Sequence, residues 1–310
     1  MEEVLARPRG RFPALNVALF LLTVATTIWA GFELSPLARD AHTLRNVIAG
    51  GLPFAATLVG ILFTHEMGHY VLARRHRVDS TLPYFIPFPG GVGTFGAVIR
   101  IRSMMPSRRA TLDIGAAGPI AGFVLAVPLL LVGLSLSEVK AVGLPPASDR
   151  IESGLDLLRI LVSGVQAGGE VQILGDSALT WLAQRAMFGA LPPGHEIFLH
   201  PVAFAAWLGL FVTALNLVPM GQLDGGHVLY ALFGRKGAER ASRLVSTVLL
   251  LCGVFVSFSW FVWWAVTRLV VGVRHPPAMV EEPLGRRRRA LAVLSLVLFA
   301  LTFVPVPVSF

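Results

Sequence analysis

Apolar and polar positions along this chain are segregated into blocks the size of whole helices. Six apolar runs are separated by more polar segments, and they cover residues 14–32, 47–73, 110–136, 198–219, 244–272 and 290–304. A helix needs about 20 apolar residues to cross a bilayer, and most of these runs reach that length. The pattern therefore predicts an all-α polytopic membrane protein with six or seven transmembrane helices.

The fifth run decides between six and seven helices. It is longer than one span requires, and it contains Gly253 and the stretch Ser-Phe-Ser at 257–259 near its middle. One long span would place the four arginines at 286–289 outside the cell, whereas a turn would keep them inside. Because cytoplasmic loops carry the excess of Lys and Arg, we favour a helical hairpin that turns near 257–259.

The basic residues that flank the runs predict the orientation. RPRGR at 7–11 precedes the first run, and RRHR at 74–77 follows the second. The positive-inside rule places both segments in the cytoplasm, together with the N-terminus, and leaves residues 138–197 outside. The first run is too long for the core of a signal peptide, so we expect an uncleaved helix. The expected location is a bacterial inner (cytoplasmic) membrane.

The segment between the second and third runs follows a different period. Residues 81–103 read TLPYFIPFPGGVGTFGAVIRIRS, in which FGAVIRIR alternates apolar and polar positions and Pro-Gly-Gly marks a turn. This predicts a small membrane-associated β element. An open sheet edge cannot face lipid, so the element must pack on helices, line a wet cavity or lie at the interface. Its edge could accept an extended peptide by strand addition.

Composition and charge narrow the class of protein. The chain is 55% hydrophobic and only 14% charged, whereas soluble domains are about 25% charged. Its net charge of +8 is scattered over the ends of the apolar runs, so we expect a lipid bilayer as partner and no nucleic acid. The single cysteine, Cys252, excludes an intrachain disulfide and a cysteine-based metal cluster.

The candidate chemistry lies inside the second run, in FTHEMGHY at 63–70. His65 and His69 are four residues apart, so on a helix they share one face and can bind one metal ion. Glu66 can reach a water on that metal; zinc lowers the pKa of such a water to about 7, and a glutamate can take its proton. Ionisable groups in an apolar run are functional by default. The alternative is a pair of core histidines hydrogen-bonded to the backbone or to Glu66.

A catalytic zinc site needs a third protein ligand and an open position. The fourth run ends in NLVPMGQLDGGHV, where Pro219 should end the helix and Asp224 precedes the expected start of the next one. Asp224 is our preferred third ligand, and His227 is its competitor. Asn216 either binds the backbone of a substrate or caps the carbonyls that Pro219 leaves free.

The motifs HEMGH, GAAGPIAG and NLVPMGQLDGGH, in this order, resemble the site-2 protease family of intramembrane zinc metalloproteases. STLPYFIPFP, GTFGAVIRIRS and VRHPPA are similar to its bacterial and plant-plastid branch, which lacks a PDZ domain. The resemblance implies one zinc ion per chain, held by His65, His69 and Asp224, with Glu66 as the general base. It also implies hydrolysis of a membrane-spanning protein substrate near the cytoplasmic side of the bilayer.

The same resemblance extends to substrate binding. It implies that the β element pairs with unwound substrate, and we assign Gly96, within that element, to substrate binding. Asn216 and Pro219 would help to position the substrate. We divide the chain into an N-terminal helix and outer loop (1–46), a metalloprotease core (47–235) with an outer excursion (138–197), and C-terminal membrane helices (236–310).

Two other classes of function stay open at this point. A polytopic metal-binding transporter could use His65, Glu66 and His69 as a transit site, but such proteins usually contain internal repeats with paired broken helices, and we find none. An inactive scaffold would typically have lost a ligand, whereas HEMGH and LDGG are intact.

The sequence identifies neither the substrate nor a need for prior cleavage of it. It also leaves open whether the chain forms a homo-oligomer.

Overall fold

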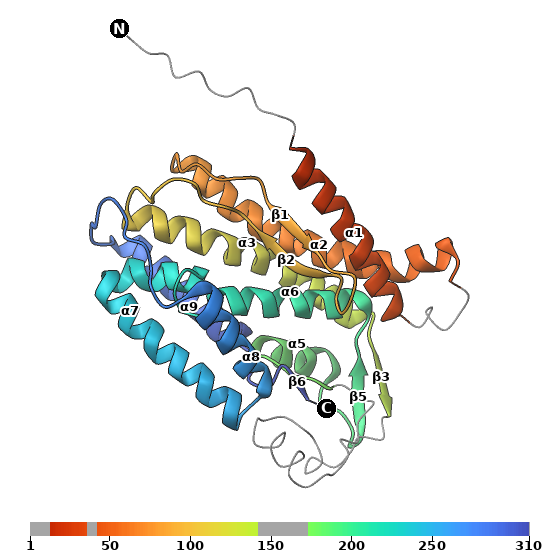
Figure 1. The fold of residues 1–310 in the computed structure, drawn as a ribbon. Helices are drawn as coiled ribbons and strands as arrows, with labels where there is room; N and C mark the ends of the chain where they lie inside the picture. Colours follow the sequence, from red (N-terminus) through yellow and green to blue (C-terminus); the bar gives the residue numbers. More distant parts are fainter. Residues whose placement is uncertain (1–12, 36–41, 142–172, 310) are drawn as a thin grey trace.

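The computed structural model describes residues 13–35, 42–141 and 173–309. Helices dominate these residues (Figure 1), and most of them overlap the predicted apolar runs, although α5 lies outside every run and α7 begins before the fifth. They are α1 (Ala14–Glu33), α2 (Leu44–Arg75), α3 (Arg108–Ser135), α5 (Ala178–Phe188), α6 (Pro201–Leu217), α7 (Asp224–Phe255), α8 (Phe258–Val266), the π-helical turn η3 (Thr267–Val271) and α9 (Arg286–Thr302). The strands are β1 (Tyr84–Pro87), β2 (Thr94–Val98), β3 (Glu138–Ala141), β4 (Ile173–Leu174), β5 (His195–Phe198) and β6 (Val308–Ser309).

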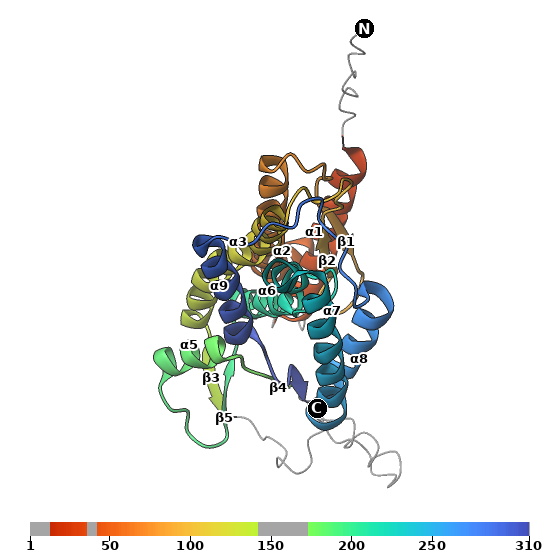
Figure 2. The ribbon, with the colours of Figure 1, turned by 90° about the vertical axis from the view of Figure 1, so that its left-hand side faces the viewer.

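The length and hydropathy of the helices support a membrane protein. In the described part of the chain, α1, α2 and α3 are each long and apolar enough to cross a bilayer. Helix α6 is also apolar but shorter. It lies at the centre of the bundle, in contact with α2, α3, α7 and α9 (Figure 2). A mostly helical membrane fold is thus confirmed, and a total of six or seven spans stays a prediction.

The fifth apolar run forms two helices that pack side by side. Helix α7 ends at Phe255 and α8 begins at Phe258, so the chain turns at 256–257, next to the predicted position. The approach of the two helices requires a glycine at position 253, because a Cβ there would lie 2.6 Å from the Cα of Phe261. Helix α7 itself bends at Gly234, whose φ of 68° is left-handed. This bend falls at the proposed boundary between the core and the C-terminal helices.

A polar contact ties the start of α9 to the helices of the core. Arg288 donates two hydrogen bonds to Asp113 on α3, from Nη2 at 2.7 Å and from Nε at 3.0 Å. The Nε2 atom of His76, which follows α2, lies 3.0 Å from the same carboxylate. The arginines at 286–289 therefore lie at the same end of the bundle as the basic residues after α2, as the hairpin requires.

The predicted β element is an antiparallel hairpin of β1 and β2. Tyr84 pairs with Val98 and Phe85 with Ala97, with an irregularity in register before Pro87. The hairpin packs along α1 and α2, and Asn16 of α1 donates hydrogen bonds to the carbonyls that precede β1. Helices α1 and α2 thus cover part of the hairpin, whereas Phe95 and Val98 of β2 remain exposed.

The described parts of the segment at 138–197 contain one helix and short strands. Its amphipathic stretch SALTWLAQRAMF contains α5, which begins with a capping box at Ser177. The other amphipathic stretch, LDLLRILV, lies outside the described residues. Strands β3 and β5 form an antiparallel pair that we did not predict. Each has only four residues, and they pair across more than fifty intervening positions, so neither gives a distinct sequence pattern.

Candidate metal centre

His65 and His69 lie on one face of α2, in its unbroken C-terminal half. Both are almost completely buried, with exposed fractions of 3% and 7%. The i, i+4 spacing places the two rings one above the other, with their centroids 4.9 Å apart. Helix α2 therefore presents two imidazoles to the interior of the bundle, as the sequence predicted.

The turn between α6 and α7 brings Asp224 to the same point. Helix α6 ends at Leu217, the chain turns through Gly221 with a φ of 55°, and Asp224 is the first residue of α7. Gly225 and Gly226 pack directly on the backbone of this turn, where an added Cβ would collide with carbonyl oxygens. The two glycines thus allow the close approach that places the carboxylate against α2.

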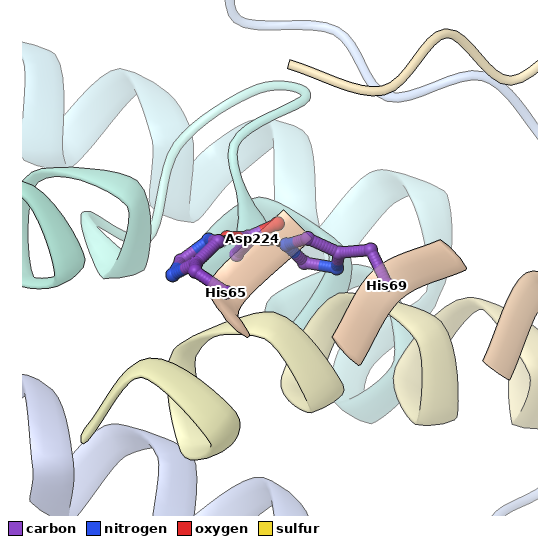
Figure 3. Close-up of side chains that lie close together, drawn as sticks. All are labelled: His65, His69 and Asp224. Atoms are coloured by element: carbon purple, nitrogen blue, oxygen red, sulfur yellow. Dashed lines mark hydrogen bonds and ion pairs between the residues drawn. The ribbon is translucent and has the colours of Figure 1, made fainter. Parts of the chain in front are cut away.

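The three side chains meet in a compact triangle (Figure 3). The Nε2 atoms of His65 and His69 are 3.1 Å apart. Each lies 3.3 Å from Oδ2 of Asp224. Ligand atoms about 2.0–2.1 Å from a tetrahedral zinc ion lie about 3.4 Å from one another. The observed distances fit a zinc ion at the centre, with a fourth position free.

The hydrogen bonds around the triangle also favour a metal. Nδ1 of His69 lies 2.7 Å from the carbonyl oxygen of Ile114. Because a carbonyl can only accept, Nδ1 carries the hydrogen and Nε2 keeps its lone pair, which is how a neighbouring group orients a metal-binding histidine. Among the described residues, these three form the one group of His, Cys, Asp and Glu with metal-binding spacing.

Small residues of α3 form the floor beneath the two histidines. A Cβ at Gly118 would overlap the ring of His69, and one at Gly122 would lie 3.2 Å from Nδ1 of His65. These glycines belong to the GAAGPIAG motif, and small residues of this kind let membrane helices pack closely. The structure adds that the space they leave is filled by the candidate ligands themselves.

A cavity of about 200 Å³ opens onto the triangle. Glu66 lies in its wall, only 6% exposed, and its carboxylate interacts with the backbone of Ile99, just after β2. The lining combines the three donors with β2, the residues after it and the turn before α7: His65, Glu66, His69, Ala97, Val98, Ile99, Ile101, Ile114, Asn216, Gln222, Leu223, Asp224 and His227. A candidate base, a candidate metal site and a strand thus share one cavity.

The other predicted site residues lie at different distances from this cavity. Asn216 is in its wall, with Nδ2 3.4 Å from Nε2 of His65. Gly96 lies on β2 immediately before the first lining residue of that strand, and Pro219 lies in the turn after α6; neither lines the cavity. His227 lines the cavity but is not part of the three-residue donor group; its Nδ1 bonds to His275 at 2.6 Å.

Sequence reasoning missed three contributors to this region. Ile99 and Gln222 line the cavity, and His275 reaches it through His227. All three lie inside motifs quoted from the sequence: Ile99 in GTFGAVIRIRS, Gln222 in NLVPMGQLDGGH and His275 in VRHPPA. The motifs were therefore an available indication, but only the fold reveals the partner of His275.

Comparison with known proteins agrees with this arrangement. The model of peptidase family M50 matches residues 53–259, which include all three donors and Glu66. The chain belongs to peptidase family M50. This match covers well over half of the chain and contains the complete cavity wall.

Curated relatives of this M50 chain are plant proteins. It is 31% identical over 86% of its length to the Arabidopsis thaliana protein named "Probable zinc metalloprotease EGY2, chloroplastic". It is 32% identical over 94% of its length to "Probable zinc metalloprotease EGY1, chloroplastic" from the same plant and, equally, to the Oryza sativa protein of that name. The chain spans 44%, 53% and 50% of these relatives, respectively, or about half of their length.

Proposed function

We propose that this chain is an intramembrane zinc endopeptidase that hydrolyses peptide bonds of membrane-spanning proteins. The observation that carries the proposal is the meeting of three donor atoms, 3.1–3.3 Å apart, with a glutamate and a strand in one cavity. Two of the donors lie on α2, which is long and apolar enough to span a bilayer. Membership of a peptidase family and relatives named as zinc metalloproteases support the same function.

In the proposed mechanism, His65, His69 and Asp224 hold zinc, which when bound supplies Lewis acidity and a water of lowered pKa. Glu66 accepts a proton from the attacking water and later donates it to the departing amine nitrogen. Burial of Glu66 in the cavity wall keeps this carboxylate within reach of the reacting atoms and away from bulk water. Asn216 is close enough to the donors to bind the substrate backbone beside the scissile bond.

We propose that the substrate binds as an extended segment along β2. A transmembrane helix hides its amide bonds in internal hydrogen bonds, so it must unwind before hydrolysis. One edge of β2 pairs with β1, while Ala97 and Val98 line the cavity. Strand addition at this side would hold the unwound backbone by main-chain hydrogen bonds and deliver it to Glu66.

The proposed cleavage site lies towards the cytoplasmic side of the membrane. At a rise of about 1.5 Å per residue, His69 lies roughly 7 Å and His65 roughly 13 Å from the basic end of α2 at Arg74. A short wet cavity can bridge that depth, and regulated intramembrane proteolysis is the corresponding biological role. The proposed orientation has the N-terminus in the cytoplasm. The location in a bacterial inner membrane stays a prediction, since the curated relatives are chloroplastic proteins.

The decisive experiment compares Glu66→Gln with the wild type in detergent or proteoliposomes. We expect the variant to keep its zinc and lose cleavage of a membrane-spanning reporter by a factor of 10² or more, because proton transfer by a positioned side chain contributes about 10²–10⁴-fold. Glu282→Gln is the matched control, because Glu282 is 47% exposed and pairs only with Arg109 at the surface. Full activity of Glu66→Gln would disprove the mechanism.

A further inference from the structure

His227 and His275 form a buried pair beside the candidate metal centre. The Nδ1 atom of His227 lies 2.6 Å from Nε2 of His275, and the two rings are almost perpendicular at 86°. His275 belongs to the stretch between η3 and α9, and it is only 3% exposed. His227 comes from α7, one turn after Asp224, and lines the cavity.

The surroundings of His275 fix which nitrogen carries its hydrogen. Its Nδ1 lies 2.6 Å from the carbonyl oxygen of Pro276. A carbonyl can only accept a hydrogen bond, so Nδ1 of His275 is the donor, and in the neutral ring Nε2 is the acceptor. Burial lowers the pKa of His275 to about 4, which keeps the ring neutral at pH 7.

This chain of hydrogen bonds determines the state of His227 in turn. Because Nε2 of His275 accepts, Nδ1 of His227 must donate, and in a neutral ring its Nε2 is left with a lone pair. No side chain in the described part of the molecule donates to that Nε2. His227 therefore offers an unoccupied hydrogen-bond acceptor from the cavity wall.

His275 is held firmly enough to impose this state. Its ring stacks on Tyr230 with centroids 4.2 Å apart and planes 10° apart. The hydroxyl of Tyr230, which is fully buried, accepts from the backbone N–H of Ala278 at 2.7 Å and donates to Glu281 at 3.1 Å. The backbone of Met279 is also bonded to that of Met105. Hydrogen bonds thus hold the stretch that contains His275 against α7 and against the residues that precede α3.

An extended peptide in the cavity needs such an acceptor. Each substrate residue brings one N–H and one C=O, and an N–H buried without a partner is costly. In the proposed function, Asp224 binds the metal and Glu66 carries the transferred proton, so neither is free to accept from substrate N–H groups. We propose that His227 accepts a hydrogen bond through Nε2 from a substrate backbone N–H beside the scissile bond, and that His275 is the positioning residue that keeps this nitrogen unprotonated. This inference rests on the proposed peptidase function.

The test replaces single amides of a peptide substrate by esters, which lack the N–H. A series of peptides carries one ester at each bond flanking the scissile bond, and kcat/KM is measured for the wild type and for His227→Phe. We expect His227→Phe to lower kcat/KM about tenfold on the all-amide peptide, mostly through KM. On the peptide whose ester removes the N–H that His227 binds, the wild type and His227→Phe should have the same kcat/KM. An equal loss on every peptide would overturn the proposal.

A second pair of variants addresses His275 without changing the cavity wall. His275→Phe keeps the stack on Tyr230 but removes the acceptor, whereas His275→Gln can restore an acceptor. We expect nitrogen NMR of histidine-labelled protein to show an unprotonated Nε2 on His227 in the wild type and in His275→Gln. In His275→Phe that preference should be lost, and kcat/KM should fall. An unchanged protonation pattern in His275→Phe would refute the role of His275.

Zinc content separates this inference from the alternatives. His227→Phe should keep a full complement of zinc, as should the control His195→Phe on β5, far from the cavity. Loss of zinc in His227→Phe alone would make His227 a metal ligand and refute its role as acceptor. The NMR measurement needs no turnover, and inactivity of Glu66→Gln is tested separately. Failure of the proposed function is therefore distinguishable from failure of this inference.

Discussion

At the scale of single residues, sequence patterns predict a candidate metal site when its residues occupy a regular helix or a turn marked by Pro and Gly. His65, Glu66 and His69 follow from helical spacing alone, and Asp224 from the break that Pro219 introduces before a new helix. The partner of His227 could not be predicted in this way. His275 contacts it across two intervening elements, and no local pattern encodes that contact.

Asp224 should be indispensable for metal binding. Replacing Asp224 by alanine leaves two imidazoles, and a catalytic zinc site needs three protein ligands. We expect zinc affinity to fall by more than the roughly 10- to 100-fold that loss of an outer-shell partner costs. Metal analysis of purified protein measures this, with Asp79→Ala as the control because Asp79 is exposed at the end of the bundle. A full complement of zinc in Asp224→Ala would exclude Asp224 as the third ligand.

At the scale of elements, the apolar runs correctly predict most of the helices and the turn near residue 257, and the alternating pattern predicts the β hairpin, whereas α5 and the first part of α7 lie outside the runs. The sequence did not predict β3 and β5, because their pairing depends on a contact between distant segments rather than on local period. The sequence contains the small-residue motif GAAGPIAG of α3 but does not reveal what its packing does. Packing of this face determines where the rings of His65 and His69 can lie.

Two glycine variants separate the packing effect from a general effect on the helices. We expect Gly118→Ala to displace the ring of His69, because its new Cβ would overlap that ring, and so to weaken zinc binding and cleavage. Gly60→Ala on α2 is the matched control, since no atom lies within 4 Å of its added Cβ. Zinc titration and circular dichroism of both variants measure the effect. Wild-type affinity in Gly118→Ala would mean that α3 can shift without cost.

At the scale of the whole molecule, Asp113 near the start of α3 contacts Arg288 near the start of α9 and His76 just after α2. These contacts fix the relative positions of the three helix ends. They place the basic residues at the end of α2 and those at the start of α9 together, although most of the core separates them in sequence. These contacts agree with the hairpin of α7 and α8, whereas the orientation of the bundle in the membrane stays a prediction of the positive-inside rule.

This orientation can be measured with single cysteines. In a Cys252→Ser background, we introduce cysteine at exposed positions: Lys236→Cys, Arg287→Cys and Ala190→Cys. We expect a membrane-impermeant thiol reagent to label positions 236 and 287 from the cytoplasmic side and position 190 from the opposite side. Labelling of 236 and 287 from opposite sides would contradict the hairpin of α7 and α8.

The position of the three donors has a further consequence for the energetics of the fold. His65 and His69 belong to α2 and Asp224 to α7, so a bound ion acts as a cross-link between segments that are remote along the chain. Binding that occurs only in the folded state adds about 2.7 kcal/mol to stability at a free zinc concentration 100 times its Kd. A strong chelator should therefore lower the Tm of the wild type but not that of Asp224→Ala. In the proposed peptidase the catalytic ion would also stabilise the fold, so metal depletion would destabilise the bundle as well as stop its chemistry.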